Sequence, residues 1–284
     1  MNLFVKVFLF CIPTIIAANS YAQKTEIGLL LGGSYYYGDI VNTNRIQTQT
    51  IGPAGGVFLR KHLNKRTCFR ANFMYARIGA ADSNLVDKKS AFQESRNLAF
   101  YADLFELSGV VEYNLILDYN KARRIVNRAI PYVYGGLGLF YFEPKAIHPI
   151  TGNPVNLRPL KLDGSTYSPI AIAFPIGAGI RYYLNRNWQL GFDIGIRFTT
   201  TSHLDDIAGD SRYANPATLP SEDAKIMLDR SVGGINSSGG TQRGKLNFIT
   251  DIYAIGGVTL TYRLWPYGLG RAFRGAAISC PRFY

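Results

Sequence analysis

The sequence predicts an all-β protein, an eight-stranded antiparallel transmembrane β-barrel of the outer-membrane type, and three observations lead to this prediction. Apolar residues alternate with small or polar ones over about eight segments, each long enough to cross a bilayer when tilted. Short turns alternate with long loops between these segments, as they do in outer-membrane barrels. The chain is also rich in glycine (29) and tyrosine (19), and 47% of it is hydrophobic.

The N-terminal segment is expected to be a secretory signal peptide. Lys6 precedes an apolar run that ends at Ala18, and small residues lead to an expected cleavage site after Ala22. The run is short for a membrane span of about 20 residues, and no later apolar run has that length, so strands must cross the membrane. The expected organisation is a signal peptide at 1–22, a transmembrane β-barrel at 23–264 and a periplasmic C-terminal tail at 265–284.

The segment Trp188–Thr199 shows the strand pattern most clearly. Every second residue from Trp188 to Phe198 is apolar, and the residues between them include Asp193 and Arg197. A period of two is the signal of a strand with two different faces. The other expected strands are, in chain order, Lys24–Asp39, Gly55–His62, Thr67–Ile78, Phe105–Leu115, Tyr132–Phe142, Ile172–Tyr183 and Ile252–Leu264.

A secreted β-sandwich would alternate in the same way, but two features favour the barrel. Glycines such as Gly177, Gly179 and Gly195 crowd the polar face, which suits a narrow lumen. Aromatic residues such as Tyr75 and Trp188 lie near strand ends, as in the interfacial girdles of membrane barrels. The apolar face is therefore expected to meet lipid in the outer membrane of a Gram-negative cell, and the polar face to line the lumen.

Charged side chains of both signs are expected inside the lumen. An eight-stranded barrel is narrow enough to be filled by its own side chains, and an isolated buried charge is costly. We therefore expect a plugged core held by ion pairs rather than a pore or a binding cavity. The expected lumen charge network consists of Glu26, Arg70, Glu106, Glu112, Arg181, Asp193, Arg197 and Arg263.

Basic residues gather on the side expected to face the periplasm, in a chain of net charge +12. The link Ile116–Pro131 is long for a periplasmic turn, and it is either a basic turn or a short helix. So many cations on one side indicate an acidic partner or a contact on the peptidoglycan side. The candidate periplasmic partner contacts are Lys121, Arg123, Arg124, Arg128, Arg271 and Arg274.

The sequence shows none of the usual metal-binding or nucleotide-binding motifs. The three histidines are scattered, there is no CxxC, and no glycine-rich loop opens a helix, so we expect no metal, no cofactor, no nucleic acid and no small-molecule substrate. The spacing of Cys68 and Cys280 does not favour a disulfide.

One constellation could belong to a hydrolase at the barrel rim, as found in some small barrels. It consists of Ser202, His203, Asp205 and Asp206. Adjacent strand residues point to opposite faces, so Ser202 and His203 cannot easily form a nucleophile–base pair. We expect these residues to cap a loop, and we expect no enzyme activity.

The chain resembles the PorG-like outer-membrane β-barrel family of the type IX secretion and gliding machinery of Bacteroidetes. The resemblance covers nearly all of the sequence after residue 22. The stretches that carry it are GLLLGGSYYYGDI, RANFMYARIGAADS, NLAFYADLFELSGVVEYNL, PYVYGGLGLFYFEPKA, FPIGAGIRYYLNRNWQLGFDIGIRFTTTSHLDDI, LDRS at 228–231, QRG at 242–244 and the terminal SCPRF.

The resemblance implies a non-enzymatic scaffold among outer-membrane lipids. Its partners would be a periplasmic ring lipoprotein and the motor components of the secretion machinery. The alternatives that the residues leave open are a general structural or narrow-pore outer-membrane protein without a role in secretion, and a rim hydrolase.

Overall fold

The computed structural model describes residues 25–38, 40, 50–82, 97–116, 120–121, 124–125, 129–185, 187–207, 212–228, 230, 243 and 250–264. The expected signal peptide and periplasmic tail lie outside these residues, so both stay sequence predictions.

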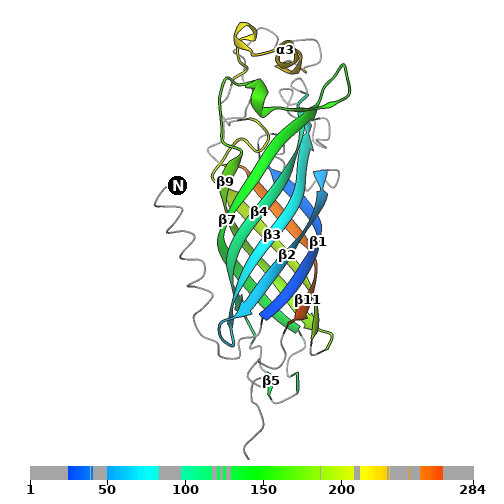
Figure 1. Cartoon of the computed structure of the whole chain (residues 1–284), viewed down its shortest axis with the longest axis vertical. Helices are drawn as coiled ribbons and strands as arrows, with labels where there is room; N and C mark the ends of the chain where they lie inside the picture. Colours follow the sequence, from blue (N-terminus) through cyan, green and yellow to red (C-terminus); the bar gives the residue numbers. More distant parts are fainter. Residues whose placement is uncertain are drawn as a thin grey trace, which may run out of the picture.

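Eight long strands close into an antiparallel barrel, which confirms the predicted fold class (Figure 1). They are β1 (Thr25–Tyr37), β2 (Gly52–His62), β3 (Thr67–Ala81), β4 (Ala99–Asn114), β7 (Ala129–Ile147), β9 (Ile170–Tyr183), β10 (Trp188–Thr199) and β11 (Ile252–Arg263). Each pairs with its neighbours in this order, and β1 pairs with β11. The closing pair sets Glu26 opposite Arg263, so the first and last strands complete the ring.

Short elements lie at the two ends of the barrel. β5 (Asn120–Lys121) pairs with β6 (Arg124–Ile125) in the link between β4 and β7, so the described residues inside this link are strand residues. At the other end lie β8 (Pro154–Asn156), the 3-10 helices η3 (Arg158–Leu160) and η4 (Pro216–Thr218), and α3 (Glu222–Leu228). Short turns follow β2 and β9 at the β5 end, which is therefore the periplasmic end. Within the described residues, no helix has the length and apolar character to cross a membrane.

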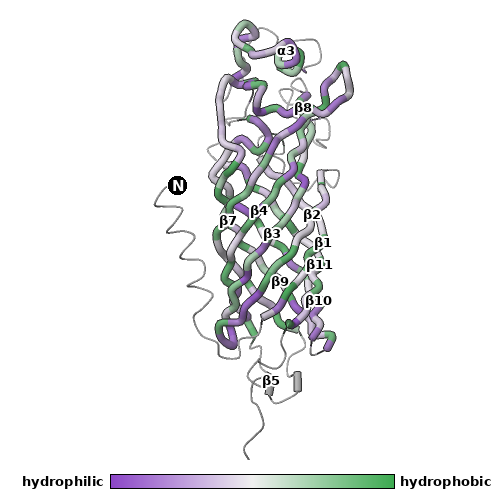
Figure 2. The backbone as a smooth tube through the Cα atoms, in the orientation of Figure 1, coloured by the Kyte–Doolittle hydropathy of each residue, from purple (hydrophilic) through white to green (hydrophobic). Residues whose placement is uncertain are grey.

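The outside of the barrel is apolar, because alternate residues of every strand point away from the lumen. Leu31 and Leu107 keep 62% and 63% of their side-chain surface exposed, although large apolar residues are normally buried. Figure 2 shows hydrophobic residues along the barrel wall and hydrophilic ones in the outer loops. A closed sheet with an apolar exterior leaves no backbone group unpaired in lipid. The protein is an integral protein of the outer membrane.

Several strands extend further outward than the sequence predicted, β4 and β7 by the most residues. β4 begins at Ala99 rather than Phe105, β3 continues to Ala81, and β7 continues to Ile147. In the extensions of β4 and β7 the outward residues include Asp103 and Lys145, so the apolar alternation that marks a membrane strand stops before the hydrogen-bonded strand does. The prediction was short because it followed lipid contact instead of backbone pairing.

Candidate functional site

A fully buried carboxylate, Glu26 of β1, ties the two ends of the barrel sheet together near the periplasmic end. It contacts Arg60 of β2 at 3.2 Å and Arg263 of β11 at 3.2 Å. It also accepts a hydrogen bond from Gln189 of β10 at 2.7 Å, and His62 lies 3.2 Å away. Since these partners come from both sides of the closing pair, Glu26 stabilises the closed ring.

A second buried carboxylate, Glu112 of β4, collects three arginines. Arg60 donates to it from β2 at 2.8 Å, Arg70 of β3 lies at 3.1 Å, and Arg181 of β9 lies at 3.6 Å. All four side chains are almost completely buried. Buried charges of this kind are tolerated when they are paired and hydrogen-bonded, and removing one partner is strongly destabilising.

Asp193 connects two opposite walls of the barrel. Arg70 of β3 donates to it at 2.9 Å, and the hydroxyls of Tyr132 and Tyr134 of β7 donate to it at 2.7 and 2.9 Å. In the strand order, β3 and β10 lie on opposite sides of the ring. The Arg70–Asp193 contact therefore crosses the whole lumen.

A second bridge crosses the lumen nearer the outer end. Glu106 of β4 accepts hydrogen bonds from Arg197 of β10 at 3.2 Å and from Tyr253 of β11 at 2.8 Å. β4 and β11 are also on opposite sides of the ring. Side chains thus occupy the axis of the barrel at two heights.

The structure brings the eight lumen residues expected from the sequence into these clusters: Glu26, Arg70, Glu106, Glu112, Arg181, Asp193, Arg197 and Arg263. The sequence analysis missed Arg60 and His62, which are also inside. The signal was present, because Phe58, Arg60 and His62 alternate with the outward residues Val57 and Leu59. Assigning the two faces of β2 by its period would have found both.

Glycines on the lumen side make room for the tyrosines that bridge the barrel. A Cβ atom on Gly177 or Gly195 would overlap the Tyr134 ring, and one on Gly179 would overlap Tyr132. The glycine-rich polar face seen in the sequence is thus a consequence of aromatic side chains that fill a narrow lumen.

The outer mouth is covered by segments 148–168, 201–207 and 212–228, here called the outer cap. Leu157, Leu204 and Met227 of the cap belong to the same continuous apolar cluster as the lumen residues Phe140 and Tyr253. The Tyr167 ring of the cap stacks on Phe142 of β7, at 6.1 Å between ring centroids. The apolar packing of the lumen therefore continues into the cap, which has α3 at the outer end of the molecule (Figure 1).

The polar residues of the cap are held in structural contacts. Asp205 accepts a hydrogen bond from Tyr36 of β1 at 2.7 Å, and Asp206 pairs with Arg243 at 2.8 Å and accepts from Tyr167 at 2.7 Å. Burial raises the pKa of the Asp206 carboxyl above its ordinary value. These contacts match the expected loop-capping role of the two aspartates.

His203 lies against Ser165 rather than forming a pair with Ser202. Its Nε2 is 3.3 Å from Ser165 Oγ, and its ring stacks on Tyr167 at 4.5 Å. Ser165 Oγ also donates to Asp163 at 2.7 Å, and that same carboxylate lies 3.9 Å from the histidine. Burial lowers the pKa of His203 below its ordinary value. The acid thus faces the serine and Nε2, instead of orienting the histidine from the far side as a catalytic triad requires.

Within the described ranges, no group of three or more histidine, cysteine, aspartate or glutamate side chains is placed to hold a metal ion. Cys68 is a free, buried thiol 3.3 Å from His62 Nδ1. Cys280 lies outside the described residues.

The candidate periplasmic contacts fall largely outside the described residues. Arg123, Arg128, Arg271 and Arg274 are not described. Lys121 and Arg124 are placed by their backbones alone, paired across β5 and β6. Their role in docking stays a prediction.

Comparison with protein families gives one match, over most of the chain. A family model described as "Domain of unknown function (DUF6089)" matches residues 3–217. A search of curated proteins finds no match.

Among solved structures, the chain is similar to several bacterial barrels at low identity. Neisserial surface protein A is 8% identical with a TM-score of 0.40, covering 86% of this chain and 98% of that chain. A major outer membrane protein from Thermus thermophilus is 13% identical with a TM-score of 0.41, covering 86% and 100%. Outer Membrane Protein W of E. coli is 11% identical with a TM-score of 0.34, covering 86% and 100%.

Proposed function

This chain belongs to the DUF6089 family, and we propose that it is a non-enzymatic outer-membrane barrel that anchors the type IX protein secretion machinery. In this role the barrel docks a periplasmic ring lipoprotein, and through it the motor components, while its wall stays in the outer-membrane lipid.

The observation that carries the proposal is the crossed lumen. Arg70–Asp193 and Tyr253–Glu106 join opposite walls, and the apolar cluster of the lumen continues into the outer cap. A barrel filled in this way is suited to act through its surfaces rather than as a conduit. The rim residues are engaged in structural contacts, which supports a non-enzymatic role.

Docking at the periplasmic end rests on charge and on resemblance. The link between β4 and β7 carries Lys121, Arg123, Arg124 and Arg128 at the end where the short turns lie. These four cations outweigh Asp118, the one acidic residue of the link, and a net positive cluster favours association with an acidic surface. The resemblance of long stretches of the chain to PorG-like barrels favours a periplasmic ring lipoprotein as this partner.

The test is a crosslinking pull-down from outer membranes with a tag in the 210–221 segment. The informative variant reverses Arg123, Arg124 and Arg128 to Glu, and the matched control reverses Lys161, Arg212 and Lys225 in the outer loops. We expect the wild type and the control to recover a periplasmic lipoprotein, and the link variant to lose it together with secretion. Both variants should show the mobility shift of a folded barrel in unheated gels.

A barrel recovered alone, from a strain in which deletion leaves secretion intact, would refute this role. Conductance in planar bilayers would then separate a general structural protein from a narrow pore, and the crossed lumen predicts no stable channel.

A further inference from the structure

The outside of the barrel changes character along one wall. On β3, β4 and β7 the outward residues pass from aliphatic or aromatic to an aromatic row and then to charge, in the order Phe73, Tyr75, Arg77 on β3, Leu107, Phe105, Asp103 on β4, and Leu139, Tyr141, Glu143 on β7. The aromatic residues are cross-strand neighbours of one another, and so are Arg77, Asp103 and Glu143.

The charged row lies where the bilayer ends. Tyr113 is the last outward residue of β4 at the periplasmic end. With a rise of about 3.3 Å per residue and a tilt of about 40°, Asp103 lies about 25 Å from Tyr113 along the membrane normal. An outward apolar band of about 25 Å is typical of outer-membrane barrels. Asp103 and its neighbours therefore face the headgroups of the outer leaflet.

These residues line a groove of about 580 Å³, here called the headgroup groove. Its charged residues are Arg77, Asp103, Glu143, Lys145 and Arg158. Tyr75, Phe105 and Tyr141 line its membrane side. The groove thus joins cations, aromatic rings and the lipid-facing wall below them.

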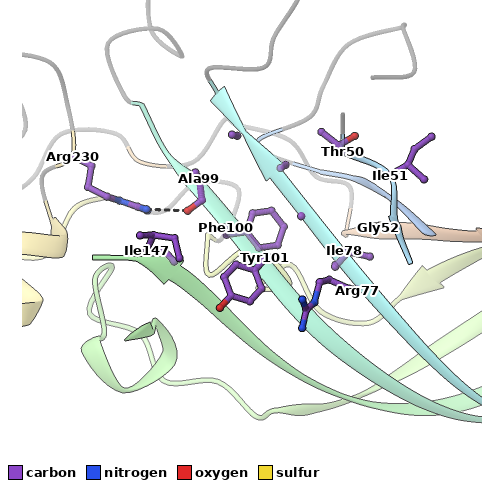
Figure 3. Close-up of a pocket in the computed structure, with 14 residues that line it drawn as sticks. Thr50, Ile51, Gly52, Arg77, Ile78, Ala99, Phe100, Tyr101, Ile147 and Arg230 are labelled. Carbon is purple, nitrogen blue, oxygen red and sulfur yellow. Dashed lines mark hydrogen bonds between the residues drawn. The ribbon is translucent and has the colours of Figure 1, made fainter. Parts of the chain in front are cut away.

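The carboxylates hold the cations in place. Asp103 accepts from Arg77 Nε at 2.7 Å and from the Tyr75 hydroxyl at 2.8 Å, and it lies 3.5 Å from Lys145. Glu143 pairs with Arg158 at 3.1 Å. The Arg77 guanidinium also lies 5.5 Å from the Tyr101 ring centroid, beside it at the outer end of β3 and β4 (Figure 3).

The cations keep donors for a ligand. Arg77 donates to Asp103 through Nε, which leaves its terminal nitrogens pointing away from that carboxylate bond. Its side chain is 48% exposed, and those of Lys145 and Arg158 are 30% and 34% exposed. Three cations against two carboxylates leave the groove positive. Oriented arginine donors of this kind suit phosphate.

The groove is confined to one side of the barrel. The outward residues of β1, β9, β10 and β11 are uncharged along their whole described length, and those of β2 are uncharged apart from Lys61 at its periplasmic end. Charged residues that served only solubility would be expected all around the barrel. The wall formed by β3, β4 and β7 instead differs from the other strands in carrying this charged row.

We propose that the headgroup groove binds the phosphorylated sugar headgroup of lipopolysaccharide in the outer leaflet. The phosphates would take the free donors of Arg77, Lys145 and Arg158, the sugar would lie on the aromatic row, and the acyl chains would follow Phe73, Leu107 and Leu139. Only an anionic amphiphile satisfies the cations and the lipid-facing wall together.

The test measures binding of defined lipids to the full-length folded barrel in detergent by native mass spectrometry. The probes are a deep-rough lipopolysaccharide with both lipid A phosphates, the same lipid without phosphates, and phosphatidylglycerol. The groove variant is Arg77→Gln/Lys145→Gln/Arg158→Gln. The control, Lys65→Gln/Lys161→Gln/Lys225→Gln, removes the same charge elsewhere, and both must show the gel shift of a folded barrel.

We expect the groove variant to bind the phosphorylated lipid at least about tenfold more weakly, and the control to change binding less than about twofold. Arg77→Lys keeps the charge and loses the paired donors of the planar guanidinium, so its affinity for the phosphorylated lipid should lie between those of the wild type and the groove variant. Equal weakening in the groove variant and the control would overturn the proposal, because it would show that overall charge decides. Unchanged binding in both variants would show that the groove does not bind this lipid and faces a protein neighbour or water instead. Phosphatidylglycerol bound as tightly as the phosphorylated lipid would show a general attraction to anionic lipids. Either result would refute it.

Discussion

Replacing Asp193 by Asn tests whether the contact across the lumen holds the barrel together. The change keeps size and shape and removes one charge. Asp193 is 2% exposed and accepts hydrogen bonds from Arg70, Tyr132 and Tyr134. The variant keeps one oxygen for Arg70 and Tyr132, and the Tyr134 hydroxyl can turn to accept from the new amide.

The expected loss follows from what remains around Arg70. Breaking a buried ion pair by removing one partner costs roughly 3–5 kcal/mol, because the other charge is left buried. Arg70 still has Glu112 at 3.1 Å, but Glu112 is shared with two other arginines. We therefore expect a loss near the lower end of this range, about 3 kcal/mol.

The measurement is urea unfolding of the barrel in lipid vesicles, followed by tryptophan emission and by the folded band in unheated gels. Trp188 is 40% exposed on the outer wall and reports loss of lipid contact. Asp223→Asn is the matched control, because Asp223 is largely exposed on α3, and it should stay within about 0.5 kcal/mol of wild type.

A double variant separates the interaction energy between Arg70 and Asp193 from the effect of changing each residue alone. Arg70→Met/Asp193→Asn should be more stable than the sum of the two single changes implies, by at least about 1 kcal/mol, since residues in contact couple by roughly 0.5–3 kcal/mol. An Asp193→Asn barrel within about 1 kcal/mol of wild type, or strict additivity in the double variant, would contradict a charge pair that bridges the lumen.

Three further predictions concern the packing of the lumen and of the outer cap. Gly195→Ala places a methyl group against the Tyr134 hydroxyl and should destabilise the barrel by about 1–3 kcal/mol, and Tyr134→Phe in the same chain should restore part of this, as measured by the same urea titration. Tyr36→Phe removes the hydroxyl that donates to the buried Asp205 carboxylate, so the outer cap should loosen by about 1–3 kcal/mol and be cut faster by protease, while the gel shift of the folded barrel stays the same. The pKa of His203 is lower in the closed cap than in an open loop, so the open form takes up the proton first as pH falls below about 6.5, and cap stability present at neutral pH is lost there. Cap proteolysis should therefore rise from pH 8 to pH 5 in wild type and not in His203→Gln, and equal pH dependence in both would show that another group controls the cap.

The fold could be predicted from the sequence because lipid imposes a simple rule. From Trp188 to Phe198, apolar residues on the lipid face alternate with small or polar residues on the lumen face. A shift of the strand register by one residue would put Asp193 and Arg197 into the bilayer. The same rule identifies the residues inside the lumen, but it does not give their partners. Arg70 and Asp193 are 123 residues apart and meet only because β3 and β10 lie on opposite sides of a closed ring.

The outer cap and the headgroup groove were beyond this kind of prediction. The cap packs through Leu157 and Leu204, which lie in irregular segments, and through Met227 of the short helix α3, so no extended period marks these residues. The groove needs the register between β3, β4 and β7, which places Arg77 beside Asp103. In the sequence these charged residues lie near the ends of strands, where they indicate only that the strand has passed beyond the lipid bilayer.

Closure of the ring by β1 and β11 has a consequence for how the protein is made. Glu26 enters the periplasm well before its partner Arg263, so the ring cannot form until β11 has also been translocated. Until then every apolar strand must be kept from aggregating, which gives periplasmic chaperones a necessary part in biogenesis. A chain that stops before Ile252 keeps an open edge on β1 and a carboxylate without its last cation. Incomplete molecules thus carry a lasting mark by which proteases can recognise and remove them.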